Sequence, residues 1–219
     1  MLPSKPALHL GFKPLKSPCL PAEFYADSAV TVARLLLGAV LCRNSNGEVL
    51  RAKIVETECY TGQNDLASHG RSGQTPRNLP MWEDPGRAYV YRTYGIHWML
   101  NVVTEPKGHP AAVLVRAVEP LSGQHVMQDL RPGRSILELT NGPGRLCQAM
   151  AITGEQNRID LTTAAAGLYI EAGTLVLDQE VQIGPRIGIE QAAEPWLSIP
   201  WRFWIAGNQY VSRGSGRQK

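Results

Sequence analysis

The sequence predicts a single compact domain of the mixed α/β (α+β) class, built around a curved, mainly antiparallel sheet with a protruding β-hairpin. The chain has 219 residues, which is enough for one well-packed core. Two β-rich runs meet at Asn46-Gly47 and two more meet near Tyr94-Gly95, as strands do in antiparallel hairpins. Short stretches with helical apolar spacing complete the pattern, and no repeat or linker divides the chain.

The first predicted elements are a helix and a hairpin. The segment DSAVTVARLLLG has apolar residues at helical spacing, with Asp27 or Ser28 as its N-cap and Gly38 to close it. The next segment, AVLCRNSNGEVLRAKIVETECY, predicts two strands joined by a tight turn at Asn46-Gly47, because this residue pair readily adopts left-handed backbone angles.

The middle and final parts of the chain predict a second hairpin, further strands and two helices. AYVYRTYGIHWMLNVV should turn near Tyr94-Gly95, and AAVLVRAVEP should be a strand that its proline ends. LSGQHVMQDLR and GPGRLCQAMAI are predicted helices, the second with Pro143 near its first turn. GLYIEAG, RIGI and RFWIAGNQYVS are predicted strands.

Both ends of the chain are predicted to be disordered. Residues 1–20 are rich in Pro, Lys and Ser, and residues 213–219 read RGSGRQK. The predicted functional domain therefore covers residues 21–212.

Composition excludes several classes of protein. The formal net charge is +3, from 22 basic and 19 acidic side chains, so overall charge does not by itself indicate a polyanionic partner. The 4 cysteines have no CxxC pair and no histidine at zinc spacing, which predicts neither a metal site nor a disulfide framework and fits a reducing compartment. No apolar stretch is long enough to span a bilayer, and the N-terminus lacks the apolar core of a signal peptide. We expect an intracellular protein without a membrane partner.

The strand IVETECY carries the first candidate chemistry. Its period of two places Ile54, Glu56, Glu58 and Tyr60 on one face and Val55, Thr57 and Cys59 on the other. A carboxylate beside an aromatic ring in a cleft is a common arrangement for a general base. An exposed polar strand face is the alternative interpretation.

Other candidates lie on the long loop after this strand and on the second hairpin. His69 lies in TGQNDLASHGRSGQTPRN, and loops of this length often carry function. Tyr91 shares a strand face with Tyr89, and Tyr94 falls at the hairpin tip, where burial in the core does not explain a large ring. Asn101 and Arg116 interrupt apolar strands, so each is either a satisfied structural hydrogen bonder or part of a site. Patterns for nucleotide, triad and zinc-protease sites are absent.

Taken together, these segments resemble the alkyladenine (N-methylpurine, or 3-methyladenine) DNA glycosylase family. The resemblance rests on VETECY, ASH, QTPRN, YVYRTYG followed by MLN, VLVRAVEP and GPGRLCQAMAI, in that order, and covers about residues 21–212. It implies a monofunctional hydrolase of base excision repair that flips alkylated or deaminated purines, such as hypoxanthine, out of duplex DNA.

The resemblance also implies roles for individual residues. Glu58 matches the general base that activates water for attack at the sugar, and Arg116 matches the arginine that helps hold this carboxylate and water. Tyr60, His69 and Tyr91 match the rings that sandwich the flipped base, and the His69 backbone N–H would reach the purine six-position. The resemblance therefore implies that these separate candidate residues take part in one reaction.

Specificity and DNA contacts follow from the same match. Asn101 corresponds to the pocket residue that rejects the exocyclic amine of normal guanine. Tyr94 corresponds to the side chain that enters the minor groove and fills the gap left by the base. The expected contacts with DNA are Tyr94, Ile96, His97, Thr75 and Arg77.

The expected protein needs no metal or organic cofactor, binds double-stranded DNA through the minor groove and acts as a monomer. It would lie in the cytoplasm or nucleoid of a bacterium, or in the nucleus of a eukaryote. Two alternatives remain at this point: a non-catalytic minor-groove damage-binding protein, and a carboxylate-dependent hydrolase of small nucleosides. Salt dependence of DNA affinity would separate the nucleoside hydrolase from the DNA-binding alternatives, since phosphate contacts release counterions.

Overall fold

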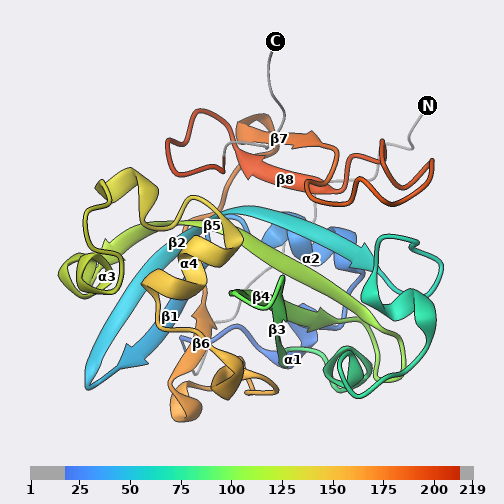
Figure 1. The fold of residues 1–219 in the computed structure, drawn as a ribbon, viewed down its shortest axis with the longest axis horizontal. Coiled ribbons are helices and arrows are strands. Elements are labelled where there is room, and N and C mark those ends of the chain that lie inside the picture. The colour runs from blue at the N-terminus through green and yellow to red at the C-terminus, as the bar shows by residue number, and fades with distance from the viewer. Residues whose placement is uncertain (1–17, 213–219) are drawn as a thin grey trace.

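The computed structural model describes residues 18–212 and contains one antiparallel sheet of 8 strands. Its main path runs β3-β4-β5-β2-β1-β6, while β8 pairs with β2 and β7 pairs with β8 (Figure 1). The strands are β1 (Val40–Ser45), β2 (Glu48–Thr61), β3 (Ala88–Thr93), β4 (His97–Thr104), β5 (Ala111–Ser122), β6 (Leu168–Glu171), β7 (Val181–Gly184) and β8 (Arg202–Ile205). The predicted fold class, a mixed α/β domain around an antiparallel sheet, is confirmed.

The helices are short and surround this sheet. They are α1 (Ala22–Tyr25), α2 (Ala29–Leu35), α3 (Gln124–Leu130) and α4 (Pro143–Ala149), with 3-10 turns η1 (His69–Ser72), η2 (Leu79–Trp82), η3 (Ile136–Glu138), η4 (Gly154–Gln156), η5 (Ala164–Ala166) and η6 (Asp178–Glu180). Ser28 is the N-cap of α2, because its hydroxyl accepts from the Thr31 N–H. Within residues 18–212, none of the helices combines the length and the apolar character needed to cross a membrane.

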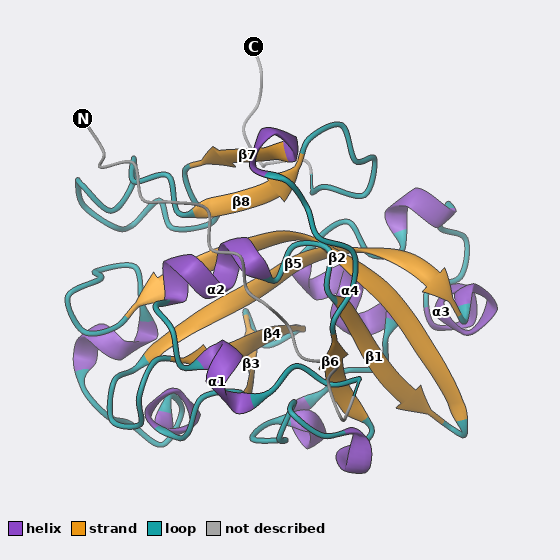
Figure 2. Ribbon diagram, turned by 180° about the vertical axis from the view of Figure 1, so that it is seen from behind, coloured by secondary structure: helices purple, strands orange, loops and turns teal. Residues whose placement is uncertain are grey.

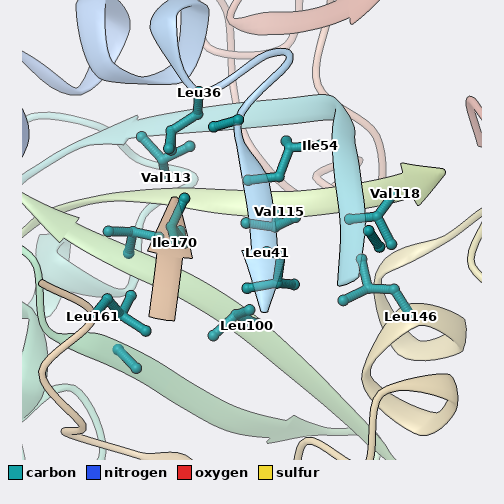
Figure 3. Packing of buried hydrophobic residues seen from close by; sticks show 14 of the residues in the cluster. Leu36, Leu41, Ile54, Leu100, Val113, Val115, Val118, Leu146, Leu161 and Ile170 are labelled. Carbon is teal, nitrogen blue, oxygen red and sulfur yellow. The ribbon is translucent and has the colours of Figure 1, made fainter. Parts of the chain in front are cut away.

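The main core lies between the sheet and helices α2 and α4, and Figure 2 shows α2 lying across β2 and β5. Figure 3 shows Leu36, the residue after α2, beside Val113 of β5, and Leu146 of α4 beside Val118 of β5. Burying each such side chain contributes roughly 1.5–3 kcal/mol. A second, smaller cluster of buried residues contains Met81, Tyr89, Val103 and Ala112. The β3–β4 hairpin thus contributes to two separate clusters.

Both predicted hairpins are present. The β1–β2 turn has left-handed angles at Asn46 and Gly47, with φ of 52° and 88°. The β3–β4 turn has φ of 49° at Tyr94 and 71° at Gly95. A left-handed angle costs a non-glycine residue about 1–2 kcal/mol, so Tyr94 is an unfavourable choice for backbone stability alone.

One prediction about strand faces is wrong, because β2 and β5 each carry an irregularity at the same place. Ile54 pairs with Val118 and Thr57 pairs with Val115. Between these pairs only Glu56 and Ala117 are partners, so Val55 of β2 and Arg116 of β5 have no partner in the register. Each strand therefore places two successive residues on one side. As a result Ile54 lies in the main core with Cys59, on the face opposite Glu58, rather than beside it.

Two strand predictions are also corrected. Pro120 does not end β5, which continues to Ser122. Because β4 pairs only with residues 111–114 of β5, the missing N–H of Pro120 interrupts no hydrogen bond between β4 and β5. RIGI is a loop, because the Ile187 N–H donates to Glu58 instead of to a neighbouring strand. The strand of this region is β7, which precedes it and was not predicted.

The predicted boundaries at the chain ends are tested only in part. Residues 18–20, assigned above to the disordered segment, belong with the sheet: Cys19 forms a bridge with Glu171, and the Leu20 N–H donates to the Ile170 carbonyl. Residues 1–17 and 213–219 lie outside the described residues.

Candidate active site

A cavity of about 190 Å³ lies beside the β3–β4 hairpin. Residues of β2, β3, β4 and β5, of the loop after β2 and of the loop after β7 form its walls. The cavity brings together five of the predicted site residues, and adds Tyr89: its lining includes Tyr60, His69, Tyr89, Tyr91, Tyr94 and Asn101. The tyrosine-rich hairpin therefore borders a cavity that is large enough to receive a ligand.

Three of these rings form a connected wall. Tyr89 and Tyr91 are stacked, with centroids 5.2 Å apart, and His69 meets Tyr91 edge-on at 4.6 Å. The Nδ1 atom of His69 and the Tyr89 hydroxyl are 2.8 Å apart, in hydrogen-bond contact. Tyr89 is fully buried, so it fixes two rings that face the cavity. Sequence reasoning noted its shared face with Tyr91 but did not identify it as a site residue.

The His69 ring is uncharged at neutral pH. His69 is partly exposed, yet desolvation of its ring, followed by the positive charges of Arg77 and Arg71, lowers its pKa to about 4. Arg77 lies over the Tyr91 ring, 5.5 Å from its centroid. The neutral histidine and the stacked tyrosines can contact a flat ring and add no positive charge of their own to the cavity wall.

Glu58 lies behind this cavity and is completely buried. Its Oε2 accepts from the Tyr60 hydroxyl at 3.0 Å, and its Oε1 accepts from the Ile187 N–H at 2.7 Å. Burial raises the pKa of Glu58 above its ordinary value, although the Arg116 charge and these hydrogen bonds oppose the shift. A carboxylate with a raised pKa beside a cavity has the properties of a general base.

Arg116 joins Glu58 to a second buried carboxylate, Glu56. Its Nη1 lies 3.2 Å from Glu58 Oε2, and its Nε donates to Glu56 Oε1 at 3.1 Å. Arg116 is the residue without a partner at the β5 irregularity, a position that redirects a side chain toward a site. Sequence reasoning placed the two carboxylates on one strand face, and the structure brings both to this arginine.

Asn101 is a buried residue of β4 that also lines the cavity. Its Nδ2 donates to the Tyr89 carbonyl at 3.1 Å, so its amide is held across the hairpin. The amide nitrogen is therefore bound within the hairpin, and the side chain lies where it can contact a ligand.

The sequence model of the methylpurine-DNA glycosylase family matches residues 23–209. The chain belongs to this family. A protein of Myxococcus xanthus is 46% identical over 202 residues, which is 91% of this chain and 97% of that protein. Proteins of Methanocella arvoryzae and Bacillus subtilis are 45% and 42% identical, over 90% and 89% of this chain and 96% of each protein. All three carry the provisional name 3-methyladenine DNA glycosylase. The predicted family is confirmed, and the chain is a DNA repair glycosylase whose substrate is DNA.

The hairpin of this glycosylase ends in exposed apolar side chains. Tyr94 is 89% exposed and Ile96 is 64% exposed, while His97 begins β4 on the surface. Thr75 and Arg77 lie on the adjacent loop: the Thr75 N–H donates to Asn78, and an Arg77 guanidinium N–H donates to the Arg92 carbonyl. The structure places these predicted DNA contacts on or beside the hairpin.

Two further residues of the glycosylase, both missed in the sequence, hold the cavity walls. Asn78 is buried and its Nδ2 donates to the carbonyls of His69 and Gly73, at 2.8 Å each. Arg186 pairs with the buried Asp65 at 2.5 and 2.9 Å, and its guanidinium lies 4.7 Å from the Tyr60 ring centroid. Asn78 was visible only as part of QTPRN, and the Arg186–Asp65 pair spans a sequence separation of 121 residues, which no local pattern reveals.

No site for a metal ion is evident in the described part of the chain. Across residues 18–212, no three His, Cys, Asp or Glu side chains gather in a way that could hold one.

Proposed function

We propose that this glycosylase flips alkylated or deaminated purines out of duplex DNA and hydrolyses the N-glycosidic bond with a water activated by Glu58, leaving an abasic site. The observation that carries the proposal is the buried Glu58, which lies behind an aromatic cavity and contacts both Tyr60 and Arg116. Chemistry at a glycosidic carbon requires the base to leave the helix, since the stacked duplex hides that carbon.

The cavity walls support recognition of a damaged purine. Tyr60, Tyr91 and His69 would enclose the flipped base, with stacking worth roughly 1–3 kcal/mol per base. Electron-rich tyrosines attract cationic alkylated purines, and a neutral His69 adds no repulsion. Asn101 would occupy the space that the exocyclic amine of guanine needs, so normal guanine is excluded.

Glu58 has the surroundings that the base role requires. Its two oxygens are fixed by the Tyr60 hydroxyl and the Ile187 N–H, and Arg116 favours its ionised form. The carboxylate would take a proton from water as the water attacks the sugar carbon, and Arg116 would help hold both. An amine nucleophile is needed for strand cleavage through a Schiff base, and among residues 18–212 no lysine lines the cavity. We therefore propose a monofunctional enzyme without lyase activity.

The exposed hairpin supports contact with the minor groove. Tyr94 would fill the place of the extruded base, with Ile96 and His97 beside it and Thr75 and Arg77 on the adjacent loop. We propose that the enzyme acts as a monomer, needs no metal or organic cofactor, and works in the compartment that holds the genome.

The decisive experiment is Glu58→Gln, because the amide keeps the side-chain shape but cannot accept a proton from water. Excision from a duplex with one ethenoadenine should fall at least a hundredfold under single-turnover conditions, while affinity for that duplex stays within about twofold. Glu171→Gln is a matched control, since Glu171 is also a buried carboxylate paired with an arginine, Arg51, but lies in β6 away from the cavity.

Retention of near wild-type excision by Glu58→Gln would remove Glu58 from the chemistry. Tight lesion binding without any excision by the wild-type protein would instead favour the non-catalytic damage-binding alternative. Glu171→Gln should keep wild-type excision in either case.

A further inference from the structure

Glu56 is a second completely buried carboxylate in β2, two positions before Glu58. Its Oε1 accepts from Arg116 Nε at 3.1 Å, Arg202 Nη1 at 3.1 Å and Ser212 Oγ at 2.9 Å. Its Oε2 accepts from the Ser212 N–H at 2.7 Å. Four hydrogen bonds from three residues therefore fix both oxygens.

This carboxylate is placed to act through Arg116 and not on the substrate. Glu56 does not line the cavity, and both of its carboxylate oxygens accept hydrogen bonds from Arg116, Arg202 or Ser212. Arg116 presents its donors in a rigid fork, so fixing Nε on Glu56 determines where Nη1 points. In this structure Nη1 forms an ion pair with Glu58 Oε2, at 3.2 Å.

We propose that Glu56 is a positioning residue of the glycosylase, which anchors Arg116 beside Glu58 and is itself held by Ser212 and Arg202. The inference rests on the proposed role of Glu58 as the base. It links Ser212 to the orientation of the reacting groups, over a sequence separation of 156 residues between Ser212 and Glu56.

The charge of Glu56 gives this role a measurable signature. Burial is the largest cause of the raised pKa of Glu58, and the negative charge of Glu56 raises it further. Arg116 on β5, the Tyr60 hydroxyl and the Ile187 N–H lower it, and the Tyr91 phenol on β3 also faces the carboxylate. Replacing Glu56 with a neutral amide removes this negative charge and should therefore lower the pKa of Glu58.

The test compares Glu56→Gln and Ser212→Ala with the Glu171→Gln control. Single-turnover excision of ethenoadenine from a duplex is measured against pH, together with lesion-DNA affinity and melting temperature. We expect Glu56→Gln to excise about tenfold to a hundredfold more slowly at the plateau, because small displacements of reacting groups have effects of this size. Its acidic limb should move to lower pH, while lesion affinity stays within about twofold. Ser212→Ala keeps the N–H donor and should lose a smaller factor.

A separate measurement keeps this inference distinct from the proposed function. The carboxyl carbon of Glu58 is titrated by NMR in the protein without DNA, and its midpoint should fall in Glu56→Gln. If the wild-type protein excises no base, the proposed function is refuted. If the Glu58 midpoint is nevertheless lower in Glu56→Gln than in the wild type, the coupling of Glu56 to Glu58 is still supported.

Two outcomes would overturn the positioning role. One is an unchanged pH profile and an unchanged Glu58 midpoint in Glu56→Gln. The other is that excision falls in both Glu56→Gln and Glu171→Gln in proportion to the fall in melting temperature of each variant. A general loss of stability would then explain both results.

Discussion

Replacing Tyr94 with serine tests whether the hairpin tip acts as a wedge. Because the side chain is 89% exposed, its removal should change the free energy of unfolding by no more than about 0.5 kcal/mol. If the ring replaces the stacking lost by the extruded base, its loss should reduce flipping by about 1–3 kcal/mol, which is roughly 5- to 140-fold. The expected result is a protein of normal stability with a large defect on duplex substrates.

The assay compares excision of one lesion in two contexts. Single-turnover rates are measured for ethenoadenine in a well-paired duplex and for the same lesion opposite a mismatch, where extrusion is already less costly. The defect of Tyr94→Ser should be largest in the well-paired duplex. Leu175→Ser is a matched control, since Leu175 is 75% exposed and does not line the cavity.

A second variant uses the backbone of the turn. Tyr94 has φ of 49°, so Tyr94→Gly should relieve strain and raise the free energy of unfolding by up to about 1 kcal/mol while it removes the wedge. A more stable but less active protein would separate the two effects. Equal losses on paired and mispaired substrates, together with a lowered melting temperature, would refute the wedge.

Three further predictions concern the cavity. Asn101→Ala should permit slow excision of undamaged guanine, first from mispairs, because it opens space for the exocyclic amine. If a base-release assay finds no free guanine, the role of Asn101 is limited to its hydrogen bond with Tyr89. The excision rate should decline as pH falls, because the general base must be ionised, and burial raises the pKa of Glu58 above its ordinary value of 4.5. A rate profile with its midpoint at or below 4.5 would contradict the assignment of Glu58 as the base. Asn78→Ala should lower the free energy of unfolding by about 1–3 kcal/mol, because it leaves the His69 carbonyl without its donor. A denaturation curve like that of the wild type would show that other contacts hold the loop.

The sequence predicts local elements well where one short segment contains the whole signal. The turns at Asn46-Gly47 and Tyr94-Gly95 were found because their residues favour left-handed backbone angles. The helix after Ser28 was found because its cap and apolar spacing are contiguous. By contrast, β7 has only four residues and leaves Ile183 58% exposed, so it has no clear alternation to detect.

The candidate site was predicted where a family pattern named its residues, and their catalytic and binding roles remain predictions. The cavity brings the aromatic residues and Asn101 together, and Arg116 joins Glu58 to the second carboxylate. The contacts that hold these groups could not be predicted from local sequence. Ser212 meets Glu56 and Arg186 meets Asp65 only after the chain has folded, and these contacts leave no periodic trace.

The paired irregularities of β2 and β5 impose a parity rule on changes in chain length. Removing Val55 alone would restore simple alternation in β2 and leave Leu50, Ala52, Ile54 and Glu58 on their present faces, but Arg116 of β5 would lose its counterpart and the pairing of the two strands would shift. Insertion of one residue elsewhere between the Gly47 turn and Glu58 would turn either the residues before it or Glu58 to the opposite face, whereas insertion of two would keep every side chain on its present face. Insertions in this segment should therefore be tolerated in even steps and rejected in odd ones, whatever residues are used.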